Sequence, residues 1–131
     1  MAGKNILLVE DNDVNRRLAG FLLRSQGYQV REATTAQAAF EMVDKDRFDL
    51  IVMDIQLPGI DGLEATRKLK EQPTTADIPV IAVTSYAMKG DREKALAAGC
   101  AGYVTKPIDK NTFIQEVAAH LGSKSNTEDG R

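Results

Sequence analysis

Short apolar runs in this sequence end beside residues that could carry out chemistry. Glu10 and Asp11 follow one such run, and Asp54 follows another. Thr84 follows a third run, and Lys106 comes after a fourth. If the runs are parallel strands of one sheet, their carboxyl ends meet at one rim, where open α/β sheets bind ligands. The sequence therefore predicts three carboxylates, a hydroxyl and an ammonium group in one pocket.

These carboxylates favour a divalent cation. Glu10, Asp11 and Asp54 bring three negative charges, and Lys106 brings one positive charge. Carboxylates held close together repel one another and raise one another's pKa unless a cation lies between them. A small set of hard oxygen ligands suits Mg²⁺, which keeps several waters, better than Ca²⁺, which takes more ligands. The prediction is a Mg²⁺ site, and an acidic cluster without metal is the alternative.

Asp54 has the setting of a nucleophile in this predicted pocket. A carboxylate can attack phosphorus and form an aspartyl phosphate when a metal neutralises the charge on the phosphoryl oxygens. Lys106 would supply a second positive charge, and the Thr84 hydroxyl would donate to another phosphoryl oxygen. The chemistry that this group of residues indicates is phosphoryl transfer to a carboxylate.

Strands and helices are expected to alternate along the chain and to position these residues. Unbroken apolar runs at 6–9, 50–53 and 80–83 are typical of parallel strands covered on both faces. Residues 28–33 mix apolar and charged side chains, as an edge strand does, and 102–105 is a shorter fifth strand. Apolar residues at helical spacing lie between the runs. The pattern predicts an α/β domain with a five-stranded parallel sheet and five helices.

Polar residues mark several expected helix starts. Thr34-x-x-Gln37 and Asp61-x-x-Glu64 resemble capping boxes, and Asp109 can cap the last helix. Residues 122–131 lack apolar side chains, so a disordered C-terminal tail is expected after a single domain over 4–121.

Composition excludes several classes of function. The chain has 131 residues, of which 43% are hydrophobic and 27% charged, as in ordinary globular domains. A formal net charge of −2 argues against nonspecific nucleic-acid binding, and the chain lacks a helix-turn-helix region. The first apolar run is too short for a signal peptide or a membrane span. We therefore expect a cytoplasmic protein without membrane insertion or direct nucleic-acid binding.

The motifs together resemble the response regulator receiver domain of two-component and phosphorelay signalling. The resemblance extends over residues 5–121, with every motif in order. Its motifs are Leu8-Val9-Glu10-Asp11-Asn12, Met53-Asp54-Ile55-Gln56-Leu57-Pro58 through Gly62, Ala82-Val83-Thr84, and Tyr103-Val104-Thr105-Lys106-Pro107. A finer similarity to hybrid-kinase receivers and single-domain cell-division regulators is carried by Glu10-Asp11-Asn12 with Asn15 and by Ala87-Met88-Lys89-Gly90-Asp91.

This resemblance implies a fold and a metal site. The fold would be a doubly wound, flavodoxin-like sheet with strand order 2-1-3-4-5, the strands being numbered along the chain. Asp54 would be the phosphoacceptor. Asp11, Asp54 and the main-chain carbonyl of Gln56 would bind Mg²⁺ directly, with Glu10 acting through water.

The resemblance also implies a switch. Lys106 would pair with the phosphoryl group through a segment that contains a cis Lys106-Pro107 peptide. Thr84 and Tyr103 would form the switch pair that reports phosphorylation. The donor would be a histidine kinase or a histidine phosphotransfer protein. An output protein would bind the face formed by the fourth helix, the fifth strand and the fifth helix.

Other functions remain as alternatives at this point. A Mg²⁺-dependent aspartyl-phosphate phosphohydrolase would resemble this site, but such enzymes generally carry Asp-x-Asp, and Gln56 stands at the second position. A flavodoxin-like cofactor carrier would need a phosphate-binding loop where Glu10 and Asp11 would repel phosphate. The chain could also be a receiver from a larger hybrid kinase or regulator. We expect a signalling domain rather than an enzyme, with at most slow autodephosphorylation.

Overall fold

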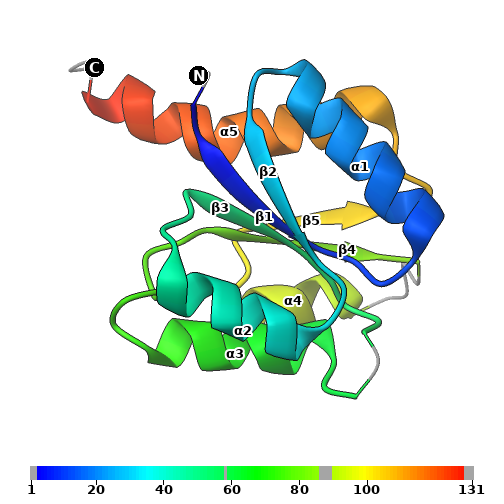
Figure 1. The fold of residues 1–131 in the computed structure, drawn as a ribbon, viewed down its shortest axis with the longest axis vertical. Coiled ribbons are helices and arrows are strands. Elements are labelled where there is room, and N and C mark those ends of the chain that lie inside the picture. Colours follow the sequence, from blue (N-terminus) through cyan, green and yellow to red (C-terminus); the bar gives the residue numbers. More distant parts are fainter. Residues whose placement is uncertain (1–2, 58, 86–89, 129–131) are drawn as a thin grey trace.

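A computed structural model describes residues 3–57, 59–85 and 90–128, with the backbone alone for 122–128. Strands and helices alternate along these residues (Figure 1). The strands are β1 (Asn5–Val9), β2 (Gln29–Ala33), β3 (Leu50–Asp54), β4 (Val80–Thr84) and β5 (Gly102–Thr105). The helices are α1 (Asp13–Ser25), α2 (Ala36–Lys45), α3 (Gly62–Glu71), α4 (Asp91–Ala97) and α5 (Lys110–Glu128).

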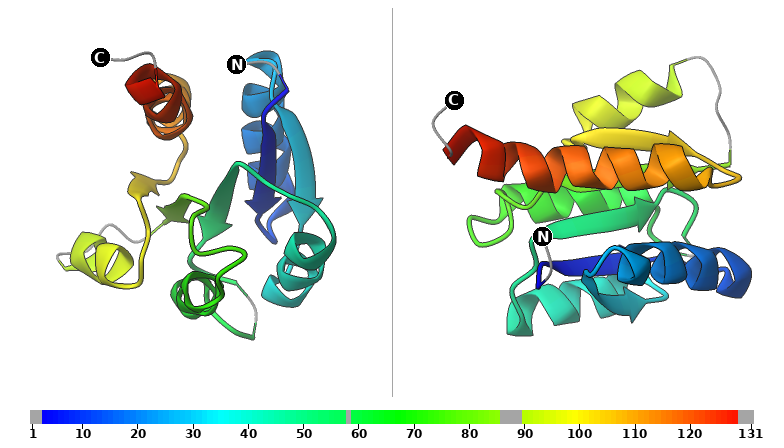
Figure 2. Two further views of the ribbon diagram at one scale, coloured as in Figure 1. Left: turned by 90° about the vertical axis from the view of Figure 1, so that its left-hand side faces the viewer. Right: turned by 90° about the horizontal axis from the view of Figure 1, so that it is seen from above.

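The strands form one parallel sheet in the order β2-β1-β3-β4-β5. Helices cover both faces: Figure 2 shows α1 and α5 on one face and α2, α3 and α4 on the other. The predicted α/β class and strand order are therefore confirmed. A parallel sheet needs a crossover connection for each added strand, and the helices supply these connections.

Alternation along each strand produces two apolar layers. On β1, Leu7 and Val9 pack with residues of α2 and α3, whereas Ile6 and Leu8 pack with residues of α1 and α5. Every residue of β3 and β4 is buried, as the unbroken apolar runs predict. β2 alternates between exposed and partly buried positions, as expected of an edge strand.

Several boundaries differ from the sequence prediction by one residue. β3 and β4 extend one residue further than predicted, so that Asp54 and Thr84 are the last residues of their strands. Thr35, rather than Thr34, caps α2 by accepting a hydrogen bond from the backbone N–H of Ala38 at 3.0 Å. Either threonine could cap a helix, but Thr35 is the one that lies three residues before an N–H without a partner inside the helix. Asp61 and Asp109 accept the corresponding bonds at α3 and α5, as predicted.

The last helix extends into the residues expected to form the C-terminal tail. α5 continues to Glu128, so residues 122–128 have helical backbone, whereas 129–131 lie outside the described residues. Residues 122–128 have no apolar side chains that could pack against the domain. They also contain no proline, which would interrupt helical hydrogen bonds. The domain limits of 4–121 and the disordered C-terminal tail stay predictions. No helix in the described part of the chain is both long and apolar enough to cross a membrane.

Candidate functional site

The three predicted carboxylates meet at the carboxyl end of the sheet. Glu10 follows β1 directly, Asp11 comes next, and Asp54 ends β3. One oxygen from each lies within 4.8 Å of the others. Glu10 and Asp54 are buried, with 3% and 2% of their surfaces exposed, whereas Asp11 is exposed at the rim. The adjacency of β1 and β3 in the sheet brings the two buried carboxylates together.

Lys106 provides the positive charge of this pocket. Its Nζ lies 3.1 Å from Glu10 Oε1 and 3.4 Å from Asp54 Oδ2, and 9% of its side chain is exposed. The Lys106 N–H donates to the Thr84 carbonyl at 2.7 Å, which joins the residue to the end of β4. The Lys106-Pro107 peptide is cis, as the resemblance implied. One ammonium group thus contacts two buried carboxylates, and one negative charge remains at the buried centre.

The loop after β3 fixes the orientation of Asp54. The Gln56 N–H donates to Asp54 Oδ1 at 3.0 Å, which leaves Oδ2 on the side of Lys106. Gly62, the first residue of α3, donates its N–H to the Ile55 carbonyl at 2.8 Å. A side chain at Gly62 would overlap the carbonyl oxygen of Asp54, so the close return of α3 to β3 requires glycine.

The environment of Glu10 raises its pKa. Burial raises the pKa of Glu10 from its ordinary value of 4.5 to about 7, and the neighbouring Asp54 carboxylate raises that pKa as well. Lys106 acts in the opposite direction and lowers the pKa of Glu10. The pocket therefore holds a proton near neutral pH that a bound cation would displace, because a metal ligand must be ionised. Once ionised, the three carboxylates exceed the single positive charge of Lys106 by two negative charges, which a divalent cation would neutralise, so the residues present fit Mg²⁺.

The raised pKa of Glu10 predicts a pH-dependent stability in metal-free buffer. Between about pH 4.5 and pH 7 the folded state keeps a proton that the unfolded chain has released, so stability falls as the pH rises. Replacing Glu10 by Gln removes this titration. We expect the wild type to lose roughly 1–2 kcal/mol relative to Glu10→Gln between pH 5 and pH 8. Urea unfolding of both proteins at each pH measures the difference, and a pH-independent difference would contradict the assignment.

The structure reveals a contact of Gln56 that the sequence did not predict. The amide Nε2 of Gln56 donates to Thr84 Oγ1 at 2.7 Å, and the backbone N–H of Ser85 donates to Gln56 Oε1 at 3.3 Å. The side chain therefore joins the loop after β3 to the end of β4. The family motif implied a metal-binding role for the main-chain carbonyl of Gln56 only. Metal binding by that carbonyl stays a prediction.

Tyr103 lies outside the carboxylate pocket. It sits on β5 opposite Ala82 of β4, and its half-buried ring packs against the apolar layer that includes Ala95 of α4. Its Oη is buried and has no hydrogen-bond partner among the described residues. Residues 86–89, which include most of the 87–91 motif, lie outside the described residues. The structure thus brings Glu10, Asp11, Asp54, Lys106 and Thr84 to one rim and places Tyr103 on the neighbouring strand.

Comparisons with known proteins agree with this geometry. The family described as response regulator receiver domain matches residues 6–118. The polar-differentiation response regulator DivK of Brucella anthropi is 42% identical over 119 residues, which are 91% of this chain and 97% of DivK.

Two solved structures have the same fold. The receiver domain of sensor histidine kinase PA1611 from Pseudomonas aeruginosa, with a magnesium ion coordinated in the active site cleft, is 39% identical with a TM-score of 0.84. That match covers 92% of this chain and 99% of the other. The signal receiver domain of a signal transduction histidine kinase from Syntrophus aciditrophicus is 30% identical with a TM-score of 0.85 and covers 92% of each chain. The residues that the family model matches, 6–118, include Glu10, Asp11, Asp54, Thr84 and Lys106.

Proposed function

Because the chain belongs to the response regulator receiver domain family, we propose that it is a phosphorylation-dependent signalling switch with Asp54 as the phosphoacceptor. The observation that carries the proposal is the placement of Asp54. Its carboxylate is buried, oriented by a backbone N–H, and 3.4 Å from the Lys106 ammonium, beside two further carboxylates. A nucleophile, a cation-binding cluster and a positive charge therefore share one pocket.

In the proposed reaction a carboxylate oxygen of Asp54 attacks the phosphorus of a phosphohistidine. The P–O bond forms, the P–N bond breaks, and the released imidazole nitrogen takes a proton. Lys106 can then contact the phosphoryl oxygens in place of its present contact with Asp54. Glu10, Asp11 and Asp54 would hold Mg²⁺, which supplies positive charge against the phosphoryl oxygens when bound. The Gln56 N–H keeps the Asp54 carboxyl oriented during attack.

A protein is the proposed phosphoryl donor: a histidine kinase or a histidine phosphotransfer protein. α1 begins two residues after Asp11 and exposes Val14, Leu18 and Phe21, with 73%, 40% and 68% of their surfaces accessible. Residues at this spacing share one face of a helix. An exposed apolar stripe beside a pocket is typical of a protein contact surface. A donor that docks on α1 would bring its phosphohistidine to the rim.

Slow hydrolysis distinguishes the proposed switch from a phosphohydrolase. The second Asp of phosphohydrolases would act as acid and base, whereas Gln56 holds an amide that cannot transfer a proton. That amide is also engaged with Thr84 and Ser85. The acyl phosphate would therefore persist long enough to signal. A receiver within a larger histidine kinase is the second candidate, favoured by the 39% identity to the PA1611 receiver.

The proposed output depends on Thr84. Its hydroxyl oxygen accepts from Gln56 at 2.7 Å, and its own O–H would donate to an oxygen of a phosphoryl group on Asp54. Movement of Thr84 toward the phosphoryl group changes the packing beside α4 and β5, where the Tyr103 hydroxyl is buried without a partner in the described structure. An unsatisfied buried hydroxyl is unfavourable by roughly 1–3 kcal/mol, so a rearrangement that pairs it is favoured. The α4–β5–α5 face is the proposed output surface.

Beryllium fluoride, which mimics a phosphoryl group on aspartate, tests this switch with Mg²⁺ present. In the wild type we expect amide NMR shifts to extend from Asp54 to the α4–β5–α5 face. Thr84→Ala should still bind the mimic but lose more than about half of the distant shifts. Without the hydroxyl, the mimic lacks a contact that favours the switched state over the unswitched one, so it shifts the equilibrium less. Thr84→Ser keeps a hydroxyl and should retain them. Full distant shifts in Thr84→Ala would contradict coupling through Thr84.

A further inference from the structure

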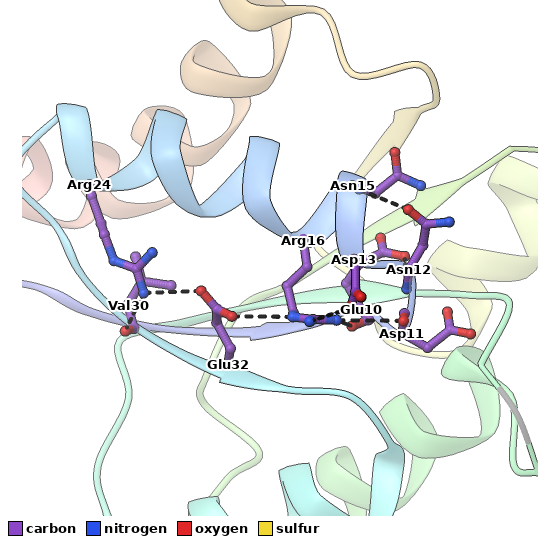
Figure 3. Close-up of polar contacts among 9 residues, drawn as sticks. All are labelled: Glu10, Asp11, Asn12, Asp13, Asn15, Arg16, Arg24, Val30 and Glu32. Carbon is purple, nitrogen blue, oxygen red and sulfur yellow. Dashed lines mark hydrogen bonds and ion pairs between the residues drawn. The ribbon is translucent and has the colours of Figure 1, made fainter.

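Arg16 makes the densest set of polar contacts beside the pocket. It lies in the first turns of α1, and 16% of its side chain is exposed. Nη1 donates to the main-chain carbonyls of Glu10 at 3.1 Å and Asp11 at 3.5 Å. Nε donates to Glu32 Oε1 of β2 at 3.2 Å, and Nη2 lies 2.6 Å from Asp13 Oδ1. Figure 3 shows the guanidinium between Glu32 on one side and the loop from Glu10 to Asp13 on the other.

The main chain around Glu10 and Asp11 determines where the Asp11 carboxylate, the exposed member of the proposed metal site, lies. Asp54 is oriented by Gln56 and Lys106, and Glu10 contacts Lys106. The Asp11 carboxylate accepts no hydrogen bond among the described residues, although it lies in the carboxylate cluster. Its position in the metal-free protein is therefore set by its backbone, and the carbonyl of that residue is one that Arg16 contacts.

The contacts of Arg16 need the geometry of a guanidinium. Its planar fork offers five donors, so one side chain can reach two carbonyls and two carboxylates together, which an ammonium group cannot. Glu32 holds the other side of the fork and also accepts from Arg24 Nη2 at 3.1 Å. Gly20 leaves room for this arrangement, because a Cβ there would lie 3.0 Å from Arg24 Nη1 and 3.3 Å from Glu32 Oε2.

We infer that Arg16 is a positioning residue for the Mg²⁺ site, because it fixes the Glu10–Asp11 main chain against β2 and so keeps the Asp11 carboxylate beside Asp54. The inference rests on the proposed function of the pocket. By charge alone, the Arg16 guanidinium near the three carboxylates would repel Mg²⁺ and weaken its binding. Removal of Arg16 therefore has opposite consequences in the two interpretations. Lost positioning weakens Mg²⁺ binding, whereas lost repulsion alone strengthens it.

The test compares Mg²⁺ affinity in three variants by calorimetry and by NMR titration of the Asp11 and Asn12 amides. Arg16→Met removes charge and donors at similar length. Arg16→Lys keeps the charge but not the fork. Arg24→Met is the matched control, because Arg24 contacts Glu32 and the Val30 carbonyl but no carbonyl of the pocket loop. Urea unfolding in chelator compares the stability of all three.

We expect both Arg16 variants to bind Mg²⁺ about tenfold more weakly than the wild type, the usual consequence of losing a residue that supports metal ligands. Arg24→Met should stay within about twofold of the wild type, because it leaves the loop contacts intact. Unchanged or tighter binding in Arg16→Met, or an equal loss in Arg24→Met, would overturn the inference. A wild type that binds no Mg²⁺ would overturn the proposed function as well, so the two failures are distinguishable.

Discussion

Replacement of Asp54 by Asn is expected to abolish phosphoryl labelling by acetyl phosphate or by a phosphohistidine protein. Asn has nearly the shape of Asp but no nucleophilic oxygen that can form a stable acyl phosphate. Asp54 ends β3 with a buried carboxylate that the Gln56 N–H orients and that lies 3.4 Å from Lys106. Glu10 lies 3.1 Å from the Lys106 ammonium and is expected to face the cation rather than the donor. Labelling should fall below detection.

Asp46→Asn is the matched control for this loss. Asp46 pairs with Arg31 at 2.8 Å on the surface and lies directly after α2, away from the carboxylate pocket. Its variant has the same change of charge but should be labelled like the wild type. Labelling of Asp54→Asn at wild-type stoichiometry would show that another residue is the acceptor.

Gly62→Ala should destabilise the fold strongly, although alanine normally favours a helix over glycine by about 1 kcal/mol. The added Cβ would overlap the Asp54 carbonyl oxygen and lie 2.8 Å from Ile55 Cα. These atoms belong to the backbone of β3 and its loop, so they cannot move aside as a flexible side chain can. We expect a loss of about 3 kcal/mol in the free energy of unfolding, measured with urea by circular dichroism.

Gly20→Ala provides the comparison for Gly62. Gly20 is also a buried helical glycine, but a Cβ there would meet the ends of the Arg24 and Glu32 side chains at 3.0 and 3.3 Å. Long side chains can shift by a few tenths of an ångström, so this variant should stay within about 1 kcal/mol of the wild type. Equal stability of Gly62→Ala and Gly20→Ala would contradict the close approach of α3 to β3.

Much of the pocket was predictable because it depends on where strands end. Apolar runs identify β1, β3 and β4, and parallel strands bring their carboxyl ends to one rim. That reasoning places Glu10, Asp54 and Thr84 together, and the structure agrees. The same reasoning misplaces strand ends by one residue. The backbone of a polar residue that follows an apolar run can still pair with the neighbouring strand.

The supporting contacts could not be predicted from the sequence. The contact of Gln56 with Thr84 depends on the direction of one side chain across two loops. The contact of Arg16 with Glu32 joins α1 to β2 across 16 positions of the chain, and charged residues on helices usually face solvent. One sequence feature did point to it: the helix that begins two residues after Glu10-Asp11 carries an arginine in its first turns. Such a residue is a candidate support for that loop.

Mapping the phosphoryl group on the wild type tests the central claim most directly. The protein is labelled with acetyl phosphate in Mg²⁺ or in chelator, and borohydride then reduces any aspartyl phosphate to homoserine before peptide mass spectrometry. We predict homoserine at position 54 in the Mg²⁺ sample and unmodified aspartate there in chelator. Modification at another carboxylate, or equal modification of Asp54 without Mg²⁺, would contradict the account.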